Sequence, residues 1–384
     1  MYRPGASQVR TTAVDGKSNP RLLGELGHVT ALRYSFTLPG GPDQMSCTLQ
    51  REARYRTSAL TPGRWVEVLR GGSVVWSGKL DEPDCSSGLW SITAQGAGVF
   101  GTSLGAVFHT WLNNPDESIN NAIARGLNWT NPGIGSPAGM WLGQRQNPGS
   151  LTITDLLNLV CTRGGLTWYV GRQNRLSVFP LPSKVNRVLV ATSPVSRSLG
   201  GDINTIWIRH RDIVPDPSDT VIKKVKKGYV TISVTNDASI AKHGPLETFL
   251  DLSSAGLMTD AEASAVGQHV LDRYQRASFA GPFTVQPGQY LNRGGVPVDL
   301  GCEQAGTVAR LVAADSGYGA EIGPKPITFA VGGYEFDDDT GSATVTPFLS
   351  LRHSFSDLLG LATLGGQPHR HHARHHRHPV IFNG

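Results

Sequence analysis

Two alternating apolar runs joined by a pair of glycines constrain the fold of this chain more than any other stretch. In the segment 63–83, GRWVEVLRGGSVVWSGKLDEP, valine and tryptophan residues alternate with other residues on both sides of Gly71-Gly72. A period of two is typical of half-buried strands, and paired glycines can take the positive φ angles of a tight primed turn. The segment therefore predicts a β-hairpin.

Similar strand patterns fill most of the chain between residues 29 and 97. They are divided by turn-rich stretches such as PGGPD at 39–43, and the 46 Gly and 24 Pro among 384 residues allow many such turns. We expect an antiparallel meander that closes into a small barrel or sandwich. Strand patterns return at 203–210, at 228–235 and in four runs beyond residue 280, which predicts a second β-rich region.

Two segments between these regions, 116–127 and 152–165, show helical spacing instead. Thr152 and Thr154 are both suited to cap the second helix. Another hairpin pattern follows at 165–182, so this part of the chain predicts a small α/β unit.

A longer helix is predicted inside the second β-rich region. Thr259 and Glu262 have the spacing of a capping box, in which each side chain accepts a hydrogen bond from the other residue's backbone N–H. One face of this helix carries apolar residues at helical spacing: Ala263, Val266, Val270 and Tyr274.

These patterns predict a mainly β fold with an α/β insertion. The expected domains are residues 1–97 (first β-barrel), 98–185 (inserted α/β), 186–350 (second β-barrel with one helix) and 351–384 (a His/Arg-rich tail).

Composition argues against several classes of protein. The net charge of +5 is spread thinly, whereas a nucleic-acid-binding protein concentrates its positive charge on one face. No apolar run approaches the roughly 20 residues of a membrane-spanning helix, and the N-terminus has no signal-peptide pattern. The four cysteines lie far apart, as expected for thiols in a reducing compartment. We therefore expect a protein made in the cytoplasm, with no membrane partner and no specific nucleic acid.

Short motifs suggest enzymatic sites only weakly. Residues 96–101, GAGVFG, match the dinucleotide-binding G-x-G-x-x-G, but they follow antiparallel strands rather than a βαβ unit. Ser103 occupies the nucleophile position of a G-x-S-x-G match, and Cys161 could be paired with His210 or His243. We expect these matches to be fortuitous, with no catalytic residue, no cofactor and no enzymatic activity.

Charged clusters have both structural and binding interpretations. The lysine-rich segment 222–230 suits an exposed strand edge that discourages unwanted pairing, or alternatively a phosphate-binding patch. Asp337, Asp338 and Asp339 could hold a calcium ion, although an Asp-rich hairpin turn is the commoner explanation.

Half of the chain's twelve histidines lie in the tail segment 369–378, HRHHARHHRH. Dense imidazoles bind Ni, Cu or Zn to some degree, and their protonation could make a contact sensitive to pH. The favoured interpretation is a mobile basic end without an essential metal. The alternative interpretation, a metal site, would use His369, His371, His372, His375, His376 and His378 as ligands.

Several stretches together resemble the baseplate hub proteins of long-tailed bacteriophages. Residues 65–83 followed by WSITAQGAG at 90–98 resemble the first barrel of that family, in which W-x-G-x-(I/L) precedes a strand carrying x-x-A-x-G. NTIWIRH at 204–210 and the S-I-x-x-(Y/H)-G pattern at 239–244 resemble its return to a second barrel. The helix at 259–274 occupies the place of the family's Ala-rich helix. The resemblance covers about residues 25–350 and is nearest to minor tail proteins of actinobacterial phages, which agrees with 26 Arg against 9 Lys.

This resemblance implies two barrels related to the tail-tube fold, with the α/β unit as an insertion. It also implies a homotrimer at the tail tip of the virion. The implied partners are the distal tail or tail tube protein, the tape measure protein, and tip or receptor-binding proteins. No catalytic residue carries over. The alternatives are a hexameric distal tail protein and a tail-associated peptidoglycan hydrolase.

Overall fold

The computed structural model describes most of the chain up to residue 348. The described segments are residues 7–14, 20–26, 29–50, 57–86, 88–106, 115–134, 152–164, 166–171, 174–180, 183–191, 203–214, 224–253, 257–274, 282–313 and 327–348.

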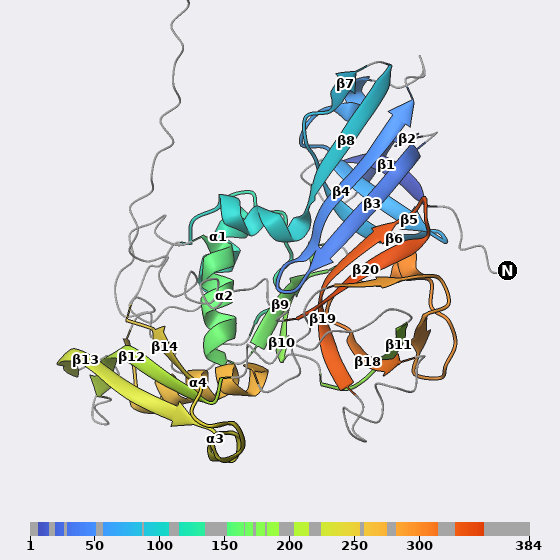
Figure 1. Ribbon diagram of the computed structural model, residues 1–384. Coiled ribbons are helices and arrows are strands. Elements are labelled where there is room, and N and C mark those ends of the chain that lie inside the picture. Colours follow the sequence, from blue (N-terminus) through green and yellow to red (C-terminus); the bar gives the residue numbers. More distant parts are fainter. Residues whose placement is uncertain are drawn as a thin grey trace, which may run out of the picture.

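One 14-stranded sheet contains strands from both ends of the chain (Figure 1). From one edge to the other the order is β17 (Tyr290–Asn292), β11 (Arg187–Ala191), β18 (Val308–Ala313), β19 (Ile327–Asp337), β3 (Val29–Thr37), β4 (Gly41–Gln50), β8 (Leu89–Gly96), β6 (Ser73–Leu80), β5 (Trp65–Arg70), β1 (Gln8–Val14) and β2 (Pro20–Leu26). Three strands lie off this path: β20 (Ser342–Pro347) pairs with β19 and β16 (Phe283–Val285), and β7 (Asp84–Ser86) pairs with β8. The mainly β class is confirmed. The described strands form no closed barrel, so the two predicted barrels stay a prediction.

The hairpin at 65–80 is confirmed. Strands β5 and β6 pair antiparallel, with Arg70 opposite Ser73. Between them, Gly71 and Gly72 have φ angles of 55° and 78°, as a primed turn requires.

The predicted simple meander is wrong, because β8 lies between β4 and β6. Strand β8 pairs with β4 along seven residues, from Gln44↔Gln95 to Gln50↔Leu89. Two glycines permit this close packing: a Cβ on Gly78 would lie 2.2 Å from the Gln95 carbonyl oxygen, and one on Gly96 would lie 1.9 Å from that of Pro42. The order of strands therefore depends on contacts that local patterns do not encode.

A single hydrophobic core spans the sheet. Tyr34 and Phe36 on β3 pack with Tyr334 and Phe336 on β19, and Trp76 on β6 belongs to the same buried cluster. Strand β19 also pairs directly with β3. Residues before 97 and residues after 282 therefore fold against each other.

The α/β unit has its own core and contacts the main sheet. It contains η2 (Ala97–Ser103), α1 (Pro115–Ala124), α2 (Ile153–Gly164), β9 (Leu166–Val170) and β10 (Leu176–Pro180). Thr152, rather than Thr154, caps α2, because its Oγ1 accepts a hydrogen bond from the Asp155 N–H at 3.1 Å. Gly40 in the β3–β4 turn exchanges backbone hydrogen bonds with β9.

A smaller sheet packs against the longer helix. It contains β13 (Lys224–Thr235), β12 (Thr205–Val214), β14 (Glu247–Asp251) and β15 (Leu257–Met258), and α4 (Asp260–Tyr274) covers one face. The capping box is confirmed: Thr259 N–H donates to Glu262 Oε2 at 2.8 Å, and Glu262 N–H donates to Thr259 Oγ1 at 3.2 Å.

Three of the four residues predicted on the apolar face of α4 are buried, namely Ala263, Val266 and Val270. The Tyr274 side chain lies outside the described residues. The S-I-x-x-(Y/H)-G pattern at 239–244, expected as a turn, instead covers most of α3 (Asp237–His243), which Gly244 terminates with φ 77°.

Two short 3-10 helices, η1 (Thr57–Leu60) and η4 (Leu300–Cys302), complete the described elements. None of the described helices is both long enough and apolar enough to cross a membrane.

Candidate functional site

The glycines of the G-x-G-x-x-G match pack against protein. A Cβ on Gly98 would lie 2.5 Å from the Gly40 carbonyl oxygen, and one on Gly101 would lie 2.6 Å from Thr154 Oγ1. Their segment continues from β8 into η2 rather than into a phosphate-binding helix. Gly98 therefore allows η2 to pack closely on the turn before β4, and Gly101 allows η2 to pack closely on α2.

The residues considered as nucleophile and base lie in different parts of the fold. Ser103 is exposed at the end of η2, and Cys161 is buried in the core of the α/β unit. His210 is buried on β12, with its Nε2 3.0 Å from Asp260 Oδ1. His243 lies on the exposed end of α3. This placement does not supply the scaffold that a nucleophile elbow needs.

The carboxylates of the three aspartates at 337–339 form hydrogen bonds and ion pairs with other groups of the protein. Asp337 Oδ1 accepts hydrogen bonds from the backbone N–H groups of Asp339 and Thr340 at 3.0 and 3.2 Å, as expected for a hairpin turn. Asp339 also accepts from the Ala31 N–H. Across the described residues, no group of three or more His, Cys, Asp or Glu side chains could hold a metal. The calcium alternative is not supported at this turn.

Of the other two charged segments, the structure describes only residues 224–230 of the lysine-rich one. The backbone of β13 forms an edge of the smaller sheet, as the edge interpretation of its lysines predicts. The side chains of Lys223, Lys224, Lys226 and Lys227 and the histidines of the tail lie outside the described residues.

Asp338 belongs to a buried charge network centred on Arg70. The Arg70 side chain is 3% exposed; its Nε lies 2.7 Å from Asp299 Oδ2 and its Nη1 lies 2.7 Å from Asp338 Oδ1. Its guanidinium carbon lies 5.0 Å from the centroid of the Phe336 ring. Burial alone would lower the pKa of Arg70, but the hydrogen bond and charge of Asp299 raise it overall, so the cation stays charged. Arg70 thereby fastens β5 to two distant segments.

Two tyrosines strengthen the same junction. Tyr34 OH donates to the Gly301 carbonyl oxygen at 2.6 Å, and Tyr334 OH donates to that of Leu300 at 2.7 Å. Burial raises the pKa of both phenols, so they remain donors.

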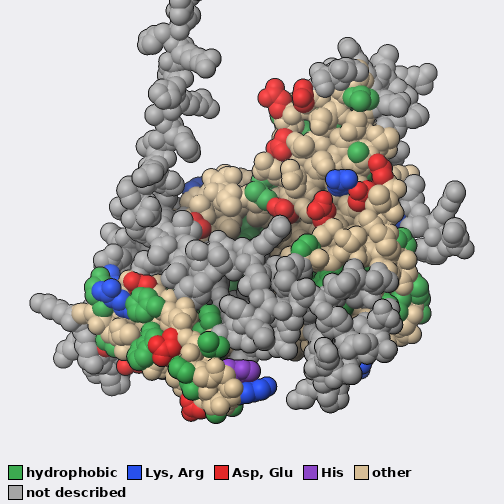
Figure 2. Space-filling model, in the orientation of Figure 1, with side chains coloured by type: hydrophobic (Ala, Val, Ile, Leu, Met, Phe, Trp, Pro, Cys, Tyr) green, Lys and Arg blue, Asp and Glu red, His purple; other side chains and the backbone are tan. Residues whose placement is uncertain are grey.

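The smaller sheet exposes aromatic side chains on the face opposite α4. Trp207, Tyr229 and Phe249 are 42%, 58% and 46% exposed, and Trp207 and Phe249 are directly paired across β12 and β14. The Arg209 guanidinium lies 4.3 Å from the centroid of the Tyr229 ring. We call Trp207, Arg209, Tyr229 and Phe249 the aromatic face. In Figure 2, hydrophobic and charged side chains lie close together over this part of the molecule.

Contiguous exposed aromatic residues with polar neighbours are typical of surfaces that bind other proteins. Among the described residues, the aromatic face is therefore the candidate assembly surface.

No family model and no curated protein matches this sequence. Solved structures do match. The tail protein from Neisseria meningitidis MC58 has a TM-score of 0.56 over 89% of this chain and 95% of its own, at 12% identity. The 43 kDa tail protein of prophage MuSo2 from Shewanella oneidensis has a TM-score of 0.57 over 89% and 98%, at 12% identity. Prophage tail protein gp18 from Listeria monocytogenes EGD-e has a TM-score of 0.56 over 93% and 99%, also at 12% identity. The chain has the fold of bacteriophage tail proteins.

This similarity confirms, at the level of the fold, the resemblance inferred from the sequence. It spans 89–93% of this chain and 95–99% of these tail proteins.

Proposed function

We propose that this chain is a structural component of a bacteriophage tail tip, a trimeric baseplate hub that joins the tail tube or the distal tail protein to the tip. The observation that carries the proposal is the fold similarity to three tail proteins along nearly their full length. A role without catalysis agrees with the placement of Ser103 and Cys161 in unrelated surroundings.

We infer a trimer because three chains with two barrels each would match the six-fold symmetry of a tail tube. If residues 25–97 and 200–350 each supply one tube-like barrel, with the two joined where β3 pairs with β19 in the main sheet, three chains form a ring of six units that can stack on a six-fold tail tube. Closed cyclic assembly also satisfies every subunit contact. In this arrangement residues 98–185 lie outside the ring, the tape measure protein occupies its channel, and tip or receptor-binding proteins attach on the far side.

The aromatic face supplies the contact between copies in this proposal. Aromatic and arginine side chains commonly dominate the binding energy of such contacts. Arg209 and Glu247 place both signs of charge beside the exposed rings: the Trp207 Nε1–H donates to Glu247 Oε2 at 3.2 Å.

Substitutions on this face test the proposal. We expect the Trp207→Ser and Phe249→Ser variants to weaken trimer formation by roughly 30-fold each, as for loss of a dominant contact residue. Leu89→Ser is the matched control, because Leu89 is 45% exposed on the main sheet, outside the aromatic face. Analytical ultracentrifugation over a concentration series measures the effect.

Two results would contradict this proposal. A wild-type hexamer would favour the distal tail protein alternative. A trimer that all three variants leave intact would show that the contact lies elsewhere.

A further inference from the structure

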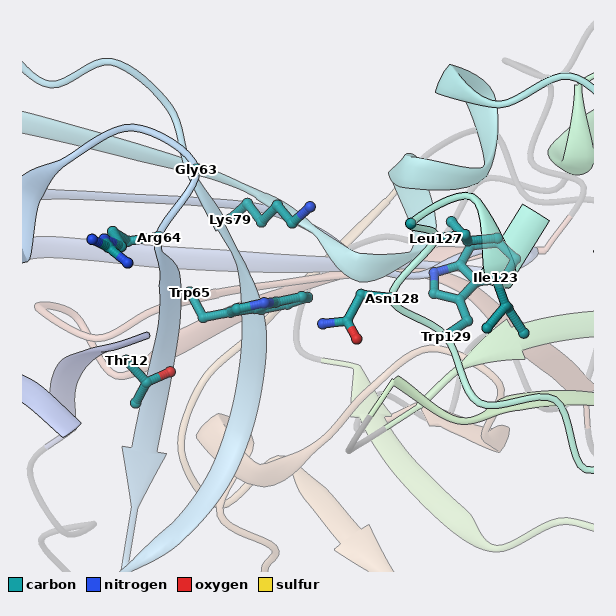
Figure 3. A pocket seen from close by; sticks show the side chains of 10 residues that line it. Thr12, Gly63, Arg64, Trp65, Lys79, Ile123, Leu127, Asn128 and Trp129 are labelled. Carbon is teal, nitrogen blue, oxygen red and sulfur yellow. The ribbon is translucent and has the colours of Figure 1, made fainter. Parts of the chain in front are cut away.

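A cavity of about 400 Å³ lies where the main sheet meets the α/β unit (Figure 3). One wall is a row of neighbours across three strands, because Thr12 is opposite Trp65 and Trp65 is opposite Lys79. The other wall is formed by residues 123–129, at the end of α1 and in the loop after it. In Figure 3, the Trp65 ring extends from its strand towards Asn128 on the other wall.

Trp65 brings an unused hydrogen-bond donor to this cavity. The residue is only 7% exposed, no hydrogen bond among the described residues uses its indole N–H, and this group is not one of their fully buried unpaired atoms. The other buried tryptophans of the described chain each donate to a protein oxygen at 2.7–3.2 Å: Trp76, Trp129 and Trp168. Because this N–H is neither paired nor fully buried, Trp65 can donate it to a ligand that supplies an acceptor.

The cavity also carries uncompensated positive charge. Lys79 Nζ lies 4.8 Å from the centroid of the Phe100 ring and 5.9 Å from that of Trp65. Arg64 lines the rim, no carboxylate lines the described walls, and no ion pair in the described chain engages Arg64 or Lys79. A cation held by aromatic rings gains further stabilisation from a charge-assisted hydrogen bond to an anion.

We propose that this cavity binds the carboxylate side chain of an acidic segment from a partner protein. The ring contacts disfavour a sugar stacked on Trp65. Lys79 lies over the Trp65 ring, and the Phe100 ring meets the Trp65 ring edge to face, with 6.0 Å between the ring centroids. The volume disfavours a bare inorganic anion, because it falls within the range of pockets that hold much larger ligands. Ile123 and Leu127 add apolar contacts for the residue beside the carboxylate. This inference does not depend on the number of subunits in the assembly.

The test uses the full-length chain labelled with 5-fluorotryptophan and observed by ¹⁹F NMR. The probes are an acetylated and amidated peptide, Gly-Glu-Leu-Gly, its Gln counterpart and inorganic phosphate. Trp65→Phe identifies the Trp65 signal, and Trp129 on the opposite wall is a second reporter. We expect the Glu peptide to shift both signals saturably and to bind about tenfold more tightly than the Gln peptide, the difference made by one charge-assisted hydrogen bond.

Substitutions separate the cavity from general charge attraction. Lys79→Met and Trp65→Phe should each weaken binding of the Glu peptide, reported by Trp129, by about tenfold. Lys242→Met should leave binding unchanged, because Lys242 is an exposed lysine on α3. The proposal is overturned if the Glu and Gln peptides bind equally, if only phosphate binds, or if Lys242→Met weakens binding as much as Lys79→Met does.

Discussion

At the scale of single residues, Arg70 has the largest expected effect on stability. Arg70→Met would leave Asp299 and Asp338 facing each other in a largely buried site without the cation that balances them. We expect the free energy of unfolding to fall by about 3 kcal/mol, the usual cost of removing one partner of a buried pair. Urea denaturation measures this loss.

Arg10→Met is the matched control for Arg70. Arg10 lies 2.6 Å from Glu67, but its side chain is 32% exposed. Exposed pairs contribute less than about 1 kcal/mol. Equal losses in the two variants would show that Arg70 does not fasten the sheet as described.

The role of Arg70 could not be predicted from the sequence. Its partners lie 229 and 268 positions further along the chain, and patterns of alternation report only on neighbours. The acidic run at 337–339 was recognisable as a turn because its hydrogen bonds are local. Its contacts with Arg70 and with Ala31 are not local, so nothing in the run itself indicated them.

At the scale of elements, the capping box stabilises the N-terminus of α4 and fixes where the helix begins. Thr259→Ala removes the acceptor of the Glu262 N–H, and we expect a loss of about 1 kcal/mol in stability. Gln268→Ala on the same helix should cost only a few tenths of a kcal/mol, because it removes an exposed contact with Asp272. Thermal melting of the two variants gives the comparison. Equal melting temperatures would show that the cap does not contribute.

Elements with a strong local signal were predicted well. The hairpin at 65–80, the helix at 153–164 and the capped helix at 260–274 all occur where their patterns indicate. The strands that local patterns missed include β1, β2, β11 and β14. Of these, β14 is parallel to β12, and β11 is parallel to β18. The positions of these strands depend on distant partners. The position of β8 between β4 and β6 depends on distant partners too, so the predicted meander was wrong there.

At the scale of the whole molecule, the fold is retained at 12% identity to known tail proteins. Conserved fold with divergent sequence explains why only a distributed resemblance is visible in the chain. The fold could be inferred from that resemblance, but the candidate binding surfaces could be identified only from contacts in the three-dimensional structure. Trp207 and Phe249 are 42 positions apart, and only the pairing of β12 with β14 brings them together.

The number and arrangement of copies in the virion test the central claim most directly. An electron cryo-microscopy reconstruction of the phage tail should show three copies of this chain at the tip, arranged as a closed ring around a central channel. Residues 98–185 should lie on the outside of that ring. Six equivalent copies, or a chain that contributes only one barrel to the ring, would contradict the assignment as a trimeric hub.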